Sequence, residues 1–78
     1  MIDFIEADYR HGYFQKIKSG QLSCQNLTKL LTSIISKTEV NRVGLIERIN
    51  LQDNCVRYII KDYQGQVLAV KDYHLSTT

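Results

Sequence analysis

The residues of this chain whose types could do chemistry are few, and their spacing favours neither a metal site nor a covalent catalyst. The histidines are His11 and His74, and the cysteines are Cys24 and Cys55. Structural zinc sites normally take their ligands in pairs two to five residues apart, and these four residues lie much further apart in sequence. We therefore expect no metal and no cofactor.

Catalytic motifs are also missing from the sequence. The chain has no glycine-rich phosphate loop, no dinucleotide fingerprint and no GxSxG motif. The carboxylates Asp3 and Glu6 suit the start of a helix, where they complement the helix dipole, better than they suit an acid–base pair. We expect no catalytic residue and no enzymatic activity.

Length and composition indicate one small domain covering residues 1–78. The chain is 44% hydrophobic and 23% charged, with a net charge of +2, which is typical of a folded domain and too weakly basic to require nucleic acid. No apolar run approaches the ~20 residues that span a bilayer. With no signal peptide and too few cysteines for a disulfide scaffold, we expect a cytoplasmic protein that binds no membrane.

Two helices are expected in the first half of the chain. Apolar residues recur at spacings of three and four from about residue 2 to 18, which favours a helix, although Phe4 and Phe14 fall off this stripe and leave a strand or hairpin possible. Ser19 and Gly20 suit a helix end. A second helix is expected over residues 24–37, with Ser23 as its N-cap and an apolar face made by Cys24, Leu27, Leu30, Leu31, Ile34 and Ile35.

From Val43 the apolar period changes to two, which predicts strands over residues 43–51, 56–61 and 67–73. Asp53 and Asn54 suit a two-residue hairpin turn, and residues 62–65 suit a type I turn with Gly65 in the left-handed conformation beside a bulge. The fold class expected is α+β in two layers, with an αα-hairpin packed on one face of a three-stranded antiparallel sheet (α-α-β-β-β).

Burial decides the expected register of the sheet. Pairing Ile60 with Leu68 and Tyr58 with Val70 gathers apolar residues on one face beside Leu45, Ile49 and Leu51, with Glu47 as the only charged member. The opposite, uncovered face then carries Ile46, Arg48, Asn50, Arg57, Ile59, Lys61, Val67, Ala69, Lys71 and Tyr73.

That uncovered face is the candidate working surface, because its charges have one sign and apolar residues lie between them. The residues we expect to bind a partner are Arg48, Arg57, Ile59, Lys61, Lys71 and Tyr73. A homodimer contact and an ordinary solvated face are the competing interpretations.

The function expected is that of a small non-enzymatic interaction protein. It would act as a regulator, an adaptor or a phage-type inhibitor of host machinery, and would bind an acidic protein or nucleoprotein partner. The alternative is a nucleic-acid-binding protein, including a small toxin-like ribonuclease, in which the cations contact phosphates and Tyr73 stacks on a base. The phage-type inhibitor and the toxin-like ribonuclease are suggested only by analogy of size and layout.

Overall fold

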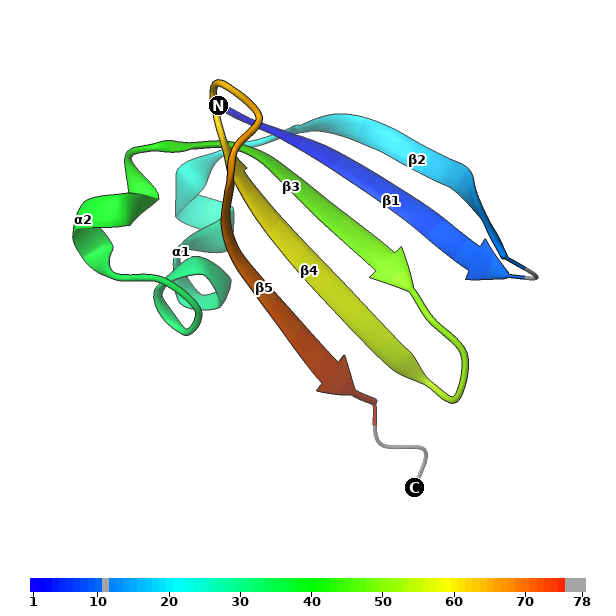
Figure 1. Cartoon of the computed structure of the whole chain (residues 1–78). Helices are drawn as coiled ribbons and strands as arrows, with labels where there is room; N and C mark the ends of the chain where they lie inside the picture. Colours follow the sequence, from blue (N-terminus) through cyan, green and yellow to red (C-terminus); the bar gives the residue numbers. More distant parts are fainter. Residues whose placement is uncertain (11, 76–78) are drawn as a thin grey trace.

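The computed structural model describes residues 1–10 and 12–75, which form a five-stranded mixed sheet and two short helices (Figure 1). The strands cross the sheet in the order β2-β1-β3-β4-β5. Strands β1 and β3 are parallel and the other neighbours are antiparallel. In chain order the elements are β1 (Ile2–Arg10), β2 (Tyr13–Leu22), α1 (Cys24–Thr32), α2 (Lys37–Val40), β3 (Val43–Asn50), β4 (Cys55–Asp62) and β5 (Val67–His74).

The expected αα-hairpin on a three-stranded antiparallel sheet is therefore wrong, and the first error lies at the N-terminus. Residues 2–10 and 13–22 form a β-hairpin, the alternative that Phe4 and Phe14 had left possible. Strand β1 hydrogen-bonds to a neighbour on each side, and this pairing outweighs a helical spacing of apolar residues. Successive residues of a strand face opposite sides of the sheet, so Ile2 and Ile5, three residues apart, lie on different faces.

The second helix is shorter than expected and ends at Thr32. The Thr32 hydroxyl donates to the carbonyl of Thr28 at 2.7 Å, and the Ser33 hydroxyl donates to the carbonyl of Leu30 at 2.6 Å. Such side-chain bonds compete with the backbone ladder, and the β-branched Ile34 and Ile35 disfavour further helix. The chain turns and resumes as the single turn α2.

The helices cover only one end of one sheet face. Figure 1 shows both helices beside the start of β3 and away from the β3–β4 turn. We call the sheet face that they contact the helix-side face and the other the open face. The core between helices and sheet consists of Ile2, Leu27, Leu31, Ile35, Val43, Ile46 and Ile60.

The three C-terminal strands lie where the sequence places them, and both turns have the expected conformations. Asp53 and Asn54 have φ of 63° and 58°, and Gly65 has φ of 86°. Hydrogen bonds of the Asp53–Asn54 turn nevertheless reveal a bulge. Cys55 N–H donates to the carbonyl of Gln52, and Leu51 N–H donates to the carbonyl of Cys55, so two residues of one strand oppose one residue of the other.

The bulge expected at Gly65 forms, since Gly65 N–H donates to the carbonyl of Asp62 and Asp62 N–H donates to the carbonyl of Gln66. A further bulge, which the sequence did not predict, follows it. Val67 pairs with Lys61, but Ala69 pairs with Ile60, which leaves Leu68 as the extra residue. Tyr58 consequently lies opposite Lys71 rather than Val70. Each bulge shifts the register by one residue, and a shift of one residue exchanges the two faces of a strand.

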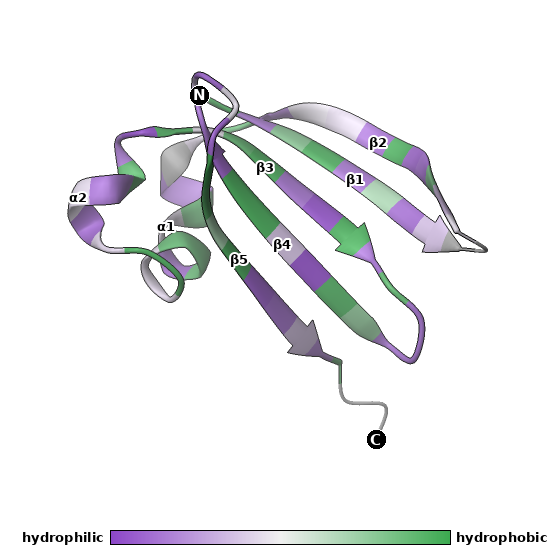
Figure 2. Ribbon diagram, viewed as in Figure 1, coloured by the Kyte–Doolittle hydropathy of each residue, from purple (hydrophilic) through white to green (hydrophobic). Residues whose placement is uncertain are grey.

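The expected faces of β3 and β5 are therefore reversed relative to β4. Ile46 and Ala69, expected on the open face, share the helix-side face with Ile60. Leu45, Ile49 and Val70, expected in the core, lie on the open face with Ile59 and Lys61. Figure 2 shows hydrophobic and hydrophilic segments following one another along β3 and β4.

Candidate binding surfaces

The six residues expected to form one partner-binding patch lie on two faces of the sheet. Arg57, Ile59 and Lys61 lie on the open face. Arg48, Lys71 and Tyr73 lie on the helix-side face, as the pairs Arg48–Tyr58, Tyr58–Lys71 and Val56–Tyr73 show. The uniformly basic surface predicted from the sequence does not form.

On the open face, the basic residues of β4 are paired with carboxylates. Lys61 forms an ion pair with Glu47, which the sequence had placed on the core face. Arg57 donates from Nε and Nη2 to the two oxygens of Asp72 at 2.8 and 3.1 Å. This hydrogen bonding lowers the pKa of Asp72 and raises that of Arg57.

The open face as a whole is balanced in charge. Its described residues include the acidic Asp3, Glu47 and Asp72 and the basic Lys16, Arg57 and Lys61. Opposite charges in neighbouring positions cancel at a distance, so the face attracts neither polyanions nor polycations.

An apolar groove of about 420 Å³ lies on the open face and is lined by side chains of β1, β2, β3 and β4. Ala7 and Ile49, 9% and 6% exposed, are buried here although they do not belong to the core beneath the helices. Phe14, 62% exposed, stands at the rim, where its ring lies 4.7 Å from that of Tyr9. The lining consists of Ile5, Ala7, Phe14, Lys16, Glu47, Ile49 and Ile59.

The helix-side face carries a second group of interacting side chains between α1 and strands β3 to β5. The Arg48 guanidinium lies 5.9 Å from the centre of the Tyr58 ring. Tyr58 meets the ring of Tyr73 edge-on at 5.8 Å, and the Tyr73 hydroxyl lies 3.4 Å from the Ser33 hydroxyl. A cavity of about 340 Å³ opens between these residues and Leu30 of α1.

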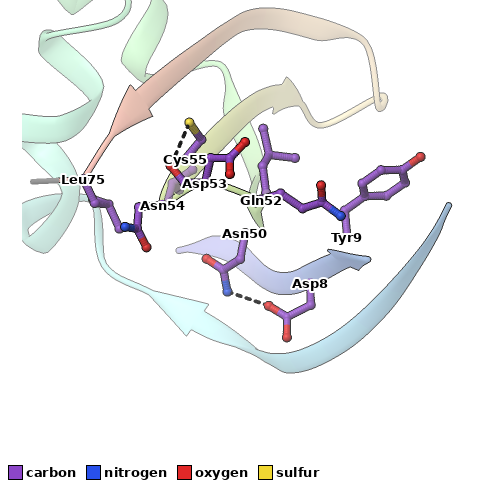
Figure 3. Close-up of a pocket in the computed structure, with 10 residues that line it drawn as sticks. Asp8, Tyr9, Asn50, Gln52, Asp53, Asn54, Cys55 and Leu75 are labelled. Atoms are coloured by element: carbon purple, nitrogen blue, oxygen red, sulfur yellow. Dashed lines mark hydrogen bonds between the residues drawn. The ribbon is translucent and has the colours of Figure 1, made fainter. Parts of the chain in front are cut away.

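A third, more polar cavity of about 500 Å³ lies at the β3–β4 turn (Figure 3). In Figure 3 the Asn50 amide points toward Asp8, to which it donates at 2.9 Å. The same amide nitrogen lies 3.4 Å from Glu6 Oε2. Two carboxylates thus share one amide donor. The residues that line this cavity include the free cysteine Cys55 and no histidine.

The histidines and cysteines that the sequence spacing argued against as zinc ligands can be followed only in part, since His11 and the side chain of Cys24 lie outside the described residues. Cys55 has a free, half-buried thiol. Within residues 1–10 and 12–75, no three His, Cys, Asp or Glu side chains are grouped as metal ligands would be. None of the helices in this part of the chain is long and apolar enough to cross a membrane.

Comparison with known proteins adds no relative to these observations. No protein-family model matches the chain, and neither a curated protein nor a solved structure shows significant similarity to it.

Proposed function

We propose that the chain is a non-enzymatic protein-interaction module of the cytoplasm, a regulator, adaptor or occluding inhibitor, which docks a partner protein on its open sheet face. The observation that carries the proposal is the apolar groove on that face, with charge-balanced residues around it. An apolar centre with a polar rim is the usual anatomy of a protein–protein interface. A free thiol such as that of Cys55 agrees with a reducing compartment.

The groove belongs to a larger apolar surface. Val70 and Val67, 52% and 57% exposed, extend it along the edge strand β5, and Phe14 extends it along β2. A standard interface takes about 800 Å² from each partner. The molecule measures 35 × 27 Å along its two longer axes, so docking of that size would use most of the open face.

The charge balance indicates which partner fits. A strongly acidic protein would have to displace Glu47 from Lys61 and Asp72 from Arg57. The phosphates of a nucleic acid would meet the same competition, so the open face favours neither of these partners. A protein with an apolar, nearly neutral surface does not have to break these ion pairs in order to dock. The open face of a second copy of this chain is such a surface.

The experiment compares variants on and off the open face. Wild type and Ile59→Asp are used to capture partners from the cells that produce the chain, and self-association of each is measured by analytical ultracentrifugation. Ile59→Asp is expected to lose the captured partner or the self-association. Tyr63→Asp is the matched control, because Tyr63 lies 73% exposed in the β4–β5 turn, away from the groove.

Two results would contradict the proposal. One is a partner that Ile59→Asp retains at wild-type affinity while its circular dichroism is unchanged. The other is a wild-type chain that captures no protein and stays monomeric at high micromolar concentration.

A further inference from the structure

Among the described residues, none supplies an anionic partner to Arg48 on the helix-side face. In the described part of the chain its guanidinium makes no hydrogen bond and no ion pair, and its Nε is buried. Its contact is with the face of the Tyr58 ring. A guanidinium that is partly buried binds an anion more strongly than a fully exposed one, because less solvent competes for its N–H groups.

The carboxylates of Glu6 and Asp8, on the neighbouring strand β1, contact Asn50. Glu6 lies opposite Arg48 on the parallel strand β1, where an ion pair would be expected. Instead, the Asn50 amide lies 3.4 Å from Glu6 Oε2 and donates to Asp8 at 2.9 Å. Asn50 thereby keeps both acidic side chains engaged while Arg48 turns toward β4.

The walls of the cavity beside Arg48 are mostly apolar and aromatic, with His74 as a second basic residue in the lining. Leu30 of α1, Val56 of β4 and Leu75 supply apolar surface, and Tyr58 and Tyr73 supply ring faces and edges. Tyr73 is held in place by its edge contact with Tyr58 and by the Ser33 hydroxyl. The volume of about 340 Å³ lies at the small end of the range for ligand cavities.

We propose that this cavity binds an apolar monocarboxylate, with the carboxylate on Arg48 and the apolar body between Leu30, Val56 and Tyr73. The planar guanidinium matches a carboxylate with two parallel hydrogen bonds. A phosphate dianion fits less well, because Glu6 and Asp8 on the adjacent strand repel a double charge more strongly. The site lies on the opposite side of the sheet from the docking groove, so it is independent of the proposed function.

Benzoate is the probe, followed by ¹H–¹⁵N NMR at the Arg48 Nε–H resonance. A saturable shift with a dissociation constant on the order of 1 mM is expected for so small a ligand. Benzamide, which has the same shape and no charge, should bind at least about tenfold more weakly, because hydrogen bonds to charged groups are the stronger ones.

Variants separate the Arg48 contact from general attraction by positive charge. Arg48→Gln should weaken benzoate binding at least about tenfold, and Arg48→Lys should weaken it several-fold because an ammonium lacks the planar fork. Lys71→Gln removes a charge from the same sheet face, opposite Tyr58 and outside the cavity lining, and should change affinity by less than about twofold. Wild-type-like amide spectra identify the variants that fold, and Arg48→Lys preserves the side-chain stem should Arg48→Gln misfold.

A second pair of probes asks whether the carboxylate comes from a free acid or from a chain end. A hexapeptide with a free C-terminal leucine is compared with its amidated form and with benzoate, and tighter binding of the free peptide than of benzoate identifies a chain end. The proposal is overturned if benzoate gives no saturable shift, if benzamide or phosphate binds as tightly, or if Lys71→Gln weakens binding as much as Arg48→Gln.

Discussion

Arg57 and Asp72 lie directly opposite each other on β4 and β5 and form a two-point hydrogen-bonded ion pair. The sequence had offered Arg57 as a free cation for a partner. The pair instead joins the edge strand β5 to β4 and removes an exposed positive charge from the open face.

The Arg57–Asp72 pair predicts a pH dependence. Hydrogen bonding to Arg57, together with its charge, lowers the pKa of Asp72 below the ordinary value of 3.8. A carboxyl group with a lowered folded-state pKa contributes stability that is present above the unfolded-state pKa and is lost as the pH falls through the folded-state pKa. Carboxyl ¹³C titration should find Asp72 below 3.8 in wild type and higher in Arg57→Gln. Lys16→Gln on the same face is the control and should leave the pKa of Asp72 unchanged. An Asp72 pKa that is the same in wild type and Arg57→Gln would contradict the prediction.

Asn50 should control whether Arg48 is available. In Asn50→Ala the amide that engages Glu6 and Asp8 is gone, so Glu6 becomes free to pair with Arg48 across the parallel strands. We expect benzoate affinity to fall several-fold and the Arg48 Nε–H resonance to shift before any ligand is added. Gln52→Ala, which like Asn50 lines the polar cavity at the β3–β4 turn, should leave both unchanged. Wild-type affinity in Asn50→Ala would show that Glu6 does not compete for Arg48.

Gly44 should tolerate no side chain. A Cβ at this position would lie 2.8 Å from Tyr63 Cδ1 and 2.9 Å from Tyr63 Cα, so the backbone itself is in the way. Gly44→Ala should cost about 1–3 kcal/mol of unfolding free energy, as overpacking does. Gly20→Ala is the matched control because its Cβ would meet no atom within 4 Å, and it should be neutral or slightly stabilising. Chemical denaturation measures both, and equal effects would contradict the close approach to Tyr63.

Two isoleucines distinguish the core from the open face. Ile46 is 0% exposed between sheet and helices, so Ile46→Val should cost about 1 kcal/mol. Ile59 is only partly buried on the open face, so Ile59→Val should cost much less at concentrations where the chain is monomeric. Denaturation at two protein concentrations provides the check. A cost for Ile59→Val that grows with concentration would indicate that a second copy covers the face.

The turns of this fold and the bulge at Gly65 could be predicted from residue types, but the bulge beside the Asp53–Asn54 turn and the one at Leu68 could not. Asp53, Asn54 and Gly65 accept positive φ, and each has it in the structure. Packing against other elements decides where each bulge places its extra residue. Leu68, for example, is left out of the β4–β5 pairing but packs against the core. Local alternation carries no signal for such an extra residue.

The N-terminal hairpin was missed for a different reason. The partner strand of β1, besides β2, is β3, which lies more than thirty residues further along the chain, and no local pattern reports that pairing. The split of the six candidate residues between two faces follows from the bulges. Arg48 forms no ion pair with Glu6 because Asn50 contacts that carboxylate, and Asn50 and Glu6 come together only through the β1–β3 pairing.

The parallel β1–β3 pair also determines how the chain must fold. The β1–β2 hairpin and the β3–β4–β5 meander each contain contacts between residues near in sequence, whereas Asp3 meets Leu45 only after a loop of about forty residues has closed. Closing long loops slows folding relative to forming hairpins. The two halves can therefore form early and join late, and until they join, Ile2 and Ile46 stay exposed to water and to other chains.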